Sequence, residues 1–588
     1  VDINFEAAVE QADVIVRRQF KTARQCMAPI EGRGLIAAWD RNLEILTLHS
    51  ATQMPHIVRT GLSECLKLDH GQIRVIAPDV GGGFGYKGIL LPEEVCACFL
   101  AMKLDKPIRW IEDRREHLIA GANCREHSYE ITGYAKGPYL MQGYRCKTWS
   151  VATNKPPILP FRGVARTGVC FAMEVLLDNI ARELKITPEA IRHRNLVRPE
   201  QMPFTNITNK FFDSGDYTEA LKRAVSAIDM TGIRAEQQSQ TGRTRIGVGL
   251  SIFCEQGAHG TSVYHGWGIP MVPGFEQAIA RLTPDGGLEL RVGVHSHGQG
   301  LETTLAQIAN SEIGIDPKKI KLVHGDTAYT PYSTGTWGSR CIVMAGGAVG
   351  TACVSLGERI SKIAGHLLQA DPAEIVLENG MARVGTSAIS IEEVAKTWYL
   401  KPQLLPDDVD PRGLEVVEGY KTVKDTGTFS YACHAVKVEV DLDLGHVRLL
   451  DYVIVEDAGT MINPMVVDGQ VYGGAAQGIG TALFEEMCFD ASGQPLASTL
   501  ADYHLPLASD LPAIRIEHME TPSPLSRFGQ KGIGESGAIG PPAAIANAVN
   551  DALSFLGAEV SEVPITPERV LAAIGHAQSG QTKSGDAA

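Results

Sequence analysis

Three absences in this 588-residue sequence limit what the protein can do. Its twelve cysteines form no Cys-x-x-Cys pair, and only Cys96 and Cys98 lie close together, which argues against a zinc ribbon or a locally bound iron–sulfur cluster. The formal net charge of −14 argues against nucleic-acid binding. No apolar run reaches the ~18 residues that span a bilayer, and no basic-then-apolar leader is present. We therefore expect a cytoplasmic protein without a membrane span.

The remaining composition is that of an ordinary globular protein, with 44% hydrophobic and 21% charged residues. Strand-like runs such as Ile73–Ala77 and Val447–Val455 alternate with helical patterns such as Glu93–Leu104 and Ala543–Leu556. Because both kinds of element occur throughout the chain, the sequence predicts an α+β (mixed α/β) fold.

The polar stretch 235–245 (AEQQSQTGRTR) is the best candidate for an interdomain linker. It would divide the chain into a first domain, 1–234, and a second domain, 246–577. The tail 578–588 is small and polar, and we expect it to be disordered.

The strongest chemical signal lies near the C-terminus, in the stretch 531–550. Glu535 stands there among glycines and small apolar residues, and the only neighbouring cation in sequence is Lys531. Such surroundings would deprive the carboxylate of solvating partners, and a desolvated carboxylate is a stronger base than one in water. Glu535 is therefore a candidate general base. The alternative is a glycine-rich loop that merely caps the helix beginning near Pro541.

Glycine-rich loops recur along the chain and favour a large polar ligand held by main-chain amides from several directions. They are 81–88, 298–300, 335–339, 469–480 and 532–540. The first contains a Gly-x-Gly-x-x-Gly pattern (Gly83, Gly85 and Gly88), as in NAD-dependent dehydrogenases. The preceding strand stops at Pro78, however, and in a dinucleotide fold it would run directly into the loop. We therefore disfavour that interpretation.

Two further clusters carry polar groups. His295 and His297 could be metal ligands, but no third ligand has suitable spacing. We favour a strand-to-helix turn at 298–300 whose amides face a phosphate or an oxo group. Arg162, flanked by apolar residues, can orient a carboxylate, a carbonyl or a developing oxyanion. A salt-bridged arginine that stabilises the turn is the alternative.

Taken in order, these clusters resemble the molybdenum-binding large subunit of the xanthine dehydrogenase, aldehyde oxidase and aerobic carbon monoxide dehydrogenase superfamily. The matching segments are Thr52-Gln53, GGGFG (81–85), FRG (161–163), GQGLETT (298–304), GTWGSR (335–340), INPMVVDGQ (462–470), GGAAQGIG (473–480) and KGIGES (531–536). Each segment is weak alone, but together they span nearly the whole chain. The resemblance implies a two-part molybdenum cofactor-binding architecture, without the family's small N-terminal domain before Val1.

The resemblance also implies a molybdopterin cofactor, here in the cytosine dinucleotide form, whose dithiolene holds the molybdenum, so that no side chain ligates the metal. Glu535 would be the base and Arg162 would face the substrate. Gln53, Phe84 and Gly85 would surround the metal, with Gln53 near an oxo ligand. The other residues implied to bind the cofactor are Gly83, Gly298, Gln299, Gly300, Thr336, Gly338, Ser339, Arg340, Gln470, Gln477, Lys531, Gly532 and Gly534.

The implied activity is the oxidative hydroxylation of an N-heteroaromatic or related carbonyl compound, with water as the oxygen donor. Electrons would leave through an iron–sulfur small subunit with [2Fe–2S] clusters and an FAD-carrying medium subunit, in a dimer of heterotrimers. An aldehyde oxidoreductase on the same fold is the alternative. An NAD-dependent dehydrogenase and a non-catalytic molybdopterin carrier are weaker alternatives, since a carrier needs no base at Glu535.

Departures from the family pattern narrow the activity. Carbon monoxide enzymes have a copper-binding cysteine where this chain has Gly163, which disfavours carbon monoxide oxidation. Purine enzymes have a glutamate where this chain has Gly88, which disfavours a xanthine-type pose. The family also has a strand-rich stretch between the motifs at His127–Ala135 and Gly137–Ser150, which here abut. We therefore suspect a gap at the junction of Ala135 and Lys136.

Overall fold

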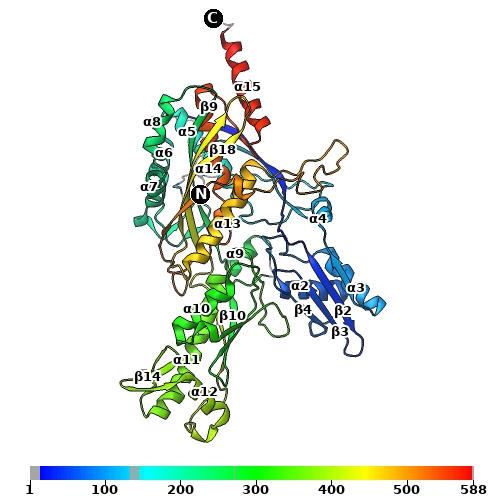
Figure 1. Cartoon of the computed structure of the whole chain (residues 1–588), viewed down its shortest axis with the longest axis vertical. Helices are drawn as coiled ribbons and strands as arrows, with labels where there is room; N and C mark the ends of the chain where they lie inside the picture. The colour runs from blue at the N-terminus through cyan, green and yellow to red at the C-terminus, as the bar shows by residue number, and fades with distance from the viewer. Residues whose placement is uncertain (1–13, 133–138, 141–142, 144, 270–271, 586–588) are drawn as a thin grey trace.

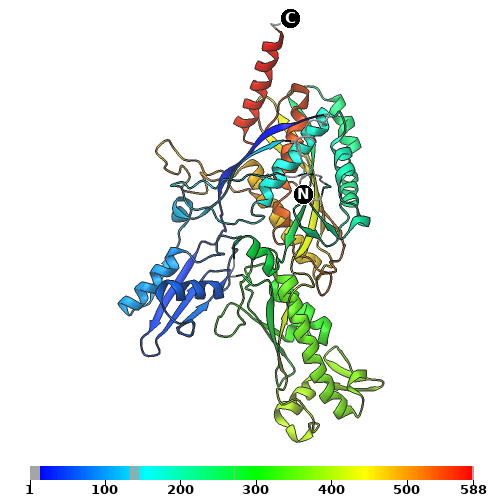
Figure 2. The same ribbon diagram turned by 180° about the vertical axis from the view of Figure 1, so that it is seen from behind.

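The structure is a computed structural model that describes residues 14–132, 139–140, 143, 145–269 and 272–585. The junction of Ala135 and Lys136, where we suspect a gap, lies outside the described residues. Figures 1 and 2 show three bodies that meet near the centre of the molecule, and helices and sheets are combined in each. The predicted mixed fold class is therefore confirmed.

The largest body, in the upper part of Figure 1, is built on a four-stranded sheet. In spatial order its strands are β19 (Ile514–Met519), β18 (Val447–Asp457), β17 (Thr428–Asp441) and β9 (Thr244–Gly257). β19 is parallel to β18, and the other neighbours are antiparallel. One face packs against α5 (Arg166–Glu183), α13 (Pro464–Leu483) and α14 (Pro541–Leu553). The other packs against α6 (Pro188–Asn195), α7 (Tyr217–Ala227) and α8 (Met230–Ser239).

The strands of this sheet alternate between the two cores, as the two-residue period of a strand requires. Phe253 and its partner Ala432 belong to the core on the α14 side, and Ile252 and Cys433 belong to the core on the α7 side. Helix α14 approaches β9 closely, because a side chain at Gly249 would collide with the backbone of α14. This close approach fixes the position of α14, which follows the loop containing Glu535.

Smaller elements complete the upper body. A three-stranded sheet contains, in spatial order, β20 (Glu562–Val563), β1 (Arg17–Cys26) and β6 (Asn123–Thr132). A short hairpin joins β7 (Phe204–Thr205) to β8 (Phe211–Phe212). Two further helices are α9 (Thr261–Gly266), directly after β9, and α15 (Pro567–Gly585), which projects from the body in Figures 1 and 2.

The N-terminal body, blue in Figure 1, contains a second four-stranded sheet. Its strands in order are β4 (Ile73–Ile76), β3 (Ile45–Ser50), β2 (Gly34–Asp40) and β5 (Ile108–Ile111). Its helices are α2 (Pro55–Leu66), α3 (Pro92–Leu104) and α4 (Arg114–Ala120). Only β3 and β4 are parallel, and a long loop separates β4 from α3. This arrangement differs from a dinucleotide fold, in which parallel strands run directly into the phosphate loop.

The third body, green in Figure 1, has a sheet ordered β12 (Ile320–Val323), β11 (Leu288–Val292), β10 (Glu276–Leu282) and β16 (Glu415–Tyr420). Its helices are α10 (Leu301–Ile313), α11 (Gly346–Leu368) and α12 (Ile391–Leu400). A meander of β13 (Val376–Glu378), β14 (Met381–Val384) and β15 (Ser387–Ser390) lies beside them.

One expectation about apolar runs needs correction in this third body. Within the described residues, the helical stretch Cys341–Leu368 is long and apolar enough to cross a membrane, with a mean hydropathy of 1.5. Of its apolar window, 67% is buried inside the protein, against residues of the core around β10 and β11. This is the burial expected of a core helix, so length and composition alone are weak evidence for a span.

The predicted domain division also differs from the arrangement in space. The segment 235–245 contains the end of α8 and the start of β9. Residues before and after it share two hydrophobic cores, because α5 to α8 pack on strands that come later in the chain. The segment therefore does not separate two structural bodies. The tail differs as well, since α15 continues to Gly585 where we expected disorder from 578.

Candidate functional site

A cavity of about 750 Å³ lies where the glycine-rich loops of the three bodies meet. Its walls come from segments 84–85, 160–166, 297–304, 336–342, 458–473 and 530–535, with Gln53 and residues of 259–269. Most of the residues predicted for the site line this cavity. The exceptions are Gly83 and Gly300, which adjoin lining residues in sequence, and Gln477, whose Oε1 lies 3.4 Å from Nη1 of the lining residue Arg162. Loops far apart in sequence therefore converge on one space.

Gln53 joins two of these loops. Its Nε2 donates a hydrogen bond to the Thr336 carbonyl oxygen at 2.8 Å, and its Oε1 accepts one from the Gly85 amide at 3.0 Å. The neighbouring backbone is in the left-handed region, with φ of 54° at Phe84 and 109° at Gly85. A side chain at Gly85 would collide with the carbonyl group of Pro160, so glycine is required there.

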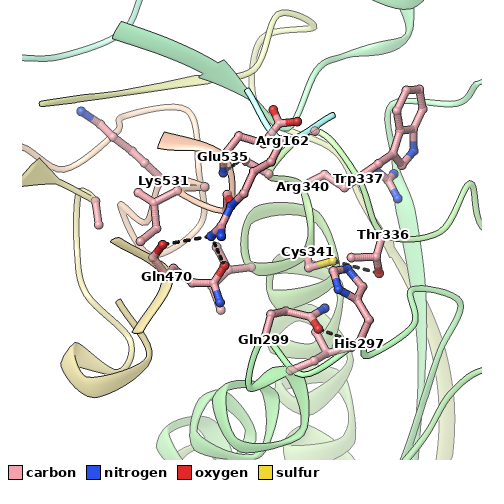
Figure 3. A pocket seen from close by; sticks show the side chains of 18 of the residues that line it. Arg162, His297, Gln299, Thr336, Trp337, Arg340, Cys341, Gln470, Lys531 and Glu535 are labelled. Carbon is pink, nitrogen blue, oxygen red and sulfur yellow. Dashed lines mark hydrogen bonds between the residues drawn. The ribbon is translucent and has the colours of Figure 1, made fainter. Parts of the chain in front are cut away.

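Arg162 is buried, and its guanidinium binds only neutral acceptors (Figure 3). Nε donates to the Gly534 carbonyl oxygen at 2.6 Å, and Nη2 donates to the carbonyl and side-chain oxygens of Gln470 at 2.9 and 3.0 Å. Nη1 reaches Gln477 Oε1 at 3.4 Å. Burial lowers the pKa of Arg162 to about 10. This cation without an ion pair among the described residues makes the cavity suitable for an anionic or electron-rich ligand.

Glu535 lines the same cavity, but it has a cationic partner that the sequence stretch did not reveal. Arg166 Nη1 lies 3.2 Å from Glu535 Oε2, and the side chains are 23% and 14% exposed. The second Arg166 nitrogen donates to the Gln256 carbonyl oxygen at 2.9 Å and lies 3.1 Å from His259 Nε2. The expectation of a carboxylate without nearby cations is therefore wrong, because Arg166 is brought in by the first turn of α5.

Sequence reasoning missed a second carboxyl group next to this site. Glu255 is fully buried on β9, and its Oε1 accepts a hydrogen bond from Ser339 Oγ at 2.5 Å. Burial, followed by the negative charge of Glu535, raises the pKa of Glu255 to about 8. A single charged residue within the apolar run of β9 was the signal that could have identified it.

Two predicted cofactor-binding cations are already engaged elsewhere. Lys531 Nζ donates to Asp457 Oδ2 at 2.7 Å, with both side chains fully buried, and also contacts Thr521 Oγ1 at 3.2 Å. Arg340 forms a buried ion pair with Glu276. Their charged groups therefore stabilise the loops, and only their remaining atoms face the cavity. Both residues line the cavity, so their predicted contact with the cofactor stays a prediction.

The predicted turn at 298–300 is present at the start of α10. Gly298 and Gly300 have φ of 100° and 76°. Gln299 stabilises its own turn, because its Oε1 accepts from the His297 amide at 2.7 Å and its Nε2 donates to the His295 carbonyl oxygen at 3.3 Å (Figure 3). The Thr336 hydroxyl also donates to that carbonyl, at 2.5 Å. Among the described residues no group of three potential metal ligands occurs.

Aromatic side chains form one wall of the cavity. Tyr264 stacks on Trp337, with ring centroids 5.0 Å apart and an interplanar angle of 23°. Trp267 meets the His259 ring edge-on at 4.8 Å and is 49% exposed. Flat apolar surfaces therefore lie on the same side of the cavity as Arg166 and Glu535. A flat, partly apolar ligand fits such a wall.

Comparisons with known proteins agree with the resemblance found in the sequence. A family model described as a molybdopterin cofactor-binding domain matches residues 223–512, and another of the same description matches 2–136 and 128–196. The nicotine 6-hydroxylase large subunit of Paenarthrobacter nicotinovorans is 34% identical over 97% of this chain and 74% of its own length. The carbon monoxide dehydrogenase large chain of Hydrogenophaga pseudoflava is 31% identical over 96% and 75%. The crystal structure of quinoline 2-oxidoreductase from Pseudomonas putida 86 superposes with a TM-score of 0.90, at 34% identity over 96% of this chain and 77% of that one.

Proposed function

Because this chain belongs to the molybdenum-binding large subunits of the xanthine dehydrogenase, aldehyde oxidase and carbon monoxide dehydrogenase family, we propose that it hydroxylates an N-heteroaromatic ring with Glu535 as the base. The chain is the catalytic subunit of a molybdopterin-dependent oxidoreductase. The observation that carries the proposal is the position of Glu535: its carboxylate shares the cavity with the buried cation Arg162 and an aromatic wall.

The residues of the cavity fit the molybdenum cofactor. Backbone amides and the Gln470 side chain supply donors for an anionic pterin. Gly85 and Gly532 leave no room for side chains, since a Cβ at either would collide with a backbone carbonyl. In the cytosine dinucleotide form, the pyrophosphate or nucleotide would be held by cavity residues of the loop after β12, namely Thr336, Gly338, Ser339 and Arg340. Gln299, in the turn before α10, would hold the pterin–phosphate region.

When bound, this cofactor supplies the oxygen atom that originates from water and takes up two electrons from the substrate. The chain's own residues provide the proton acceptor and the orientation. Ionised Glu535 accepts the proton released as the oxygen is transferred to the ring carbon. Arg166 holds the carboxylate in place at 3.2 Å. Arg162 stabilises the negative charge that develops on the ring, in a cavity where burial strengthens the interaction.

Three observations favour a heteroaromatic ring over carbon monoxide. The aromatic wall of Tyr264, Trp267 and Trp337 suits a flat ring, and two similar proteins are described as a nicotine 6-hydroxylase and a quinoline 2-oxidoreductase. Gly163 has a φ of 88°, and a Cβ there would lie 2.5 Å from Thr167 Oγ1. The backbone at the position of the copper-binding cysteine therefore disfavours any side chain. An aldehyde oxidoreductase remains the alternative.

The electrons taken from the substrate must leave the chain. Within the described residues no cysteine set suits an iron–sulfur cluster, and similar proteins are described as large subunits or large chains. We therefore propose an iron–sulfur subunit with [2Fe–2S] clusters and an FAD subunit as partners, in a dimer of heterotrimers. All twelve cysteines are free, which supports the proposed cytoplasmic location.

The first test concerns the proposed general base, Glu535. Glu535→Gln should abolish substrate-dependent dye reduction while leaving the molybdenum and nucleotide content of the purified complex unchanged. Glu358→Gln, an exposed glutamate on α11, is the control and should retain activity. Near-normal turnover by the Glu535→Gln enzyme would contradict the assignment.

A dye-reduction screen tests the substrate class. Pyridines or quinolines should reduce the purified complex fastest. Purines should reduce it more slowly, because Gly88 replaces the glutamate of the purine enzymes, and aldehydes should also reduce it more slowly. Reduction by aldehydes alone would replace the proposed substrate class with the alternative. Replacing Trp337 by Ala should raise KM for a heteroaromatic substrate roughly 10-fold or more, since an aromatic contact is worth about 1 kcal/mol beyond its buried area.

A further inference from the structure

Glu255 lies behind the proposed base and does not line the cavity. It stands near the end of β9, where the antiparallel register pairs it with Ser430 of β17. The same register places Glu456 of β18 opposite Ala432, two residues further along β17 and on the same face of the sheet. This face is covered by the loop 535–540 that leads into α14. The carboxyl group of Glu255 is therefore aimed from the sheet toward the loop that carries Glu535.

Ser339 connects the two carboxyl-bearing residues. The Glu535 amide donates to Ser339 Oγ at 3.2 Å, so the Ser339 hydroxyl hydrogen is free to point the other way, to Glu255 Oε1 at 2.5 Å. The negative charge of Glu535 also raises the pKa of the Glu255 carboxyl group. The second oxygen of Glu255 has a distant donor, Ser430 Oγ at 3.5 Å.

The charges around this pair decide how many protons it holds. Two adjacent carboxylates in a buried site repel each other strongly, so such a pair retains one proton. Glu535 reaches the cavity and is bonded to Arg166, whereas Glu255 is fully buried and has no ion pair among the described residues. Burial raises the pKa of Glu255 to about 8, and the charge of Glu535 adds to the effect. The retained proton therefore lies on Glu255.

We propose that Glu255 and Glu535 form a carboxyl pair that holds a single proton on Glu255, and that Glu255 is thereby a positioning residue that keeps Glu535 ionised and oriented for catalysis. The protonated Glu255 donates to the Glu535 carboxylate, while Ser339 Oγ still donates to Glu255 Oε1 and accepts from the Glu535 amide. The inference rests on the proposed role of Glu535 as the base.

The pair has a defined set of charged and titratable neighbours. They are Arg166 at the start of α5, Arg162 on the preceding loop, Arg125 on β6, Tyr264 on α9, Glu456 on β18 and Cys254 on β9 itself. Burial raises the pKa of Cys254 to about 12 and lowers that of Arg162 to about 10. Neither group titrates near the pKa of Glu255. Burial also raises the pKa of Glu456, which makes Glu456 the matched control.

The test compares pH profiles of the complete enzyme with a heteroaromatic substrate that does not titrate in the alkaline range. In the wild type, kcat should fall above the pKa of Glu255, about 8, because a second negative charge then replaces the donor to Glu535. Glu255→Gln keeps a neutral donor and should lose this alkaline limb while retaining activity near neutrality. Glu456→Gln should keep the limb. An unchanged limb in Glu255→Gln would overturn the proposal.

Two further measurements test the pair, the first through the pH profile of a second variant and the second without turnover. Ser339→Ala removes a hydrogen bond that stabilises ionised Glu255, so the alkaline limb should move to higher pH. Infrared pH titration of the wild type without substrate should show a protonated carboxyl band that disappears near pH 8 and is absent from Glu255→Gln. Identical infrared titrations of the wild type and Glu255→Gln would overturn the proposed carboxyl pair. If Glu535→Gln remained active, the proposed base would fail instead, whatever the infrared result.

Discussion

Single residues at this site carry charges whose partners lie far away in the chain. Glu535 was expected to stand alone, yet it pairs with Arg166, which is 369 residues earlier. The glycine-rich surroundings read from the sequence are real, but they create space for a tertiary partner as well as for a ligand. Local composition therefore indicates how accessible a carboxylate is, but it does not reveal which cation pairs with it.

Arg166→Met tests the importance of this ion pair. Removing the guanidinium should leave the Glu535 carboxylate poorly oriented and lower kcat roughly 10- to 100-fold, because a charge-assisted hydrogen bond contributes about 1.5–3 kcal/mol. Arg412→Met, at an exposed ion pair with Asp410, is the control. Steady-state kinetics together with molybdenum content provide the measurement, and equal kcat in both variants would contradict this role.

Gly163→Cys tests whether the copper-binding pattern can be restored at the residue scale. The backbone φ of 88° and the contact with Thr167 should destabilise the variant by about 1–3 kcal/mol. We expect no gain of carbon monoxide oxidation. Gly71→Cys, where no atom lies within 4 Å of the added Cβ, should unfold at nearly the wild-type temperature. Equal melting temperatures for the two variants would argue against backbone strain at Gly163.

At the scale of elements, most strands and helices follow from residue periodicity. The predicted strand Ile73–Ala77 coincides with β4 and the predicted helix Glu93–Leu104 coincides with α3, each to within one residue. Long, uniform patterns give this result because burial repeats along the whole element. The segment 235–245 was interpreted as a linker because it is polar, but a polar stretch is also typical of the exposed end of a helix such as α8.

Gly249→Ala tests the packing of α14 against β9. The added methyl group would collide with the backbone at Ala544 and Ala548, so we expect a loss of about 1–3 kcal/mol in unfolding free energy. The displaced helix should also shift the Glu535 loop and lower kcat. Gly419→Ala on β16, where the nearest atom to the added Cβ is 3.8 Å away, is the strand control. Comparable denaturation midpoints in the two variants would disprove this account.

At the scale of the whole molecule, buried histidines couple stability to pH. Burial lowers the pKa of His434, His56 and His295 to about 3. These groups stay neutral when folded but take up protons near pH 6.5 when unfolded, so their contribution to stability is lost as the pH falls from 6.5 toward 3. Buried Glu94 and Glu485, with pKa values raised to about 7 by burial, act oppositely, because stability falls as the pH rises from 4.5 to 7.

His434→Leu isolates one part of this dependence. His434 is fully buried, and among the residues that the structure describes its side chain has Tyr452 as its one hydrogen-bond partner, at 3.0 Å. Between pH 7 and pH 5 the variant should lose about 2 kcal/mol less unfolding free energy than the wild type, since each pH unit below 6.5 costs about 1.4 kcal/mol. The exposed His49→Leu should match the wild type. Denaturant unfolding at the two pH values measures the difference, and parallel curves would refute it.

The sequence by itself determined the mixed fold class, the glycine-rich loops in their order and the identity of the candidate base, because these depend on local composition and spacing. Only the tertiary structure decided which charges are available. It assigned Lys531 and Arg340 to buried ion pairs and placed Glu255 behind Glu535. In the described part of the chain it left Arg162 without an ion pair. The physical reason is that a charge is neutralised or exposed by whatever chain segment packs beside it. In this protein those segments are separated by tens to hundreds of residues and meet only where the three bodies join.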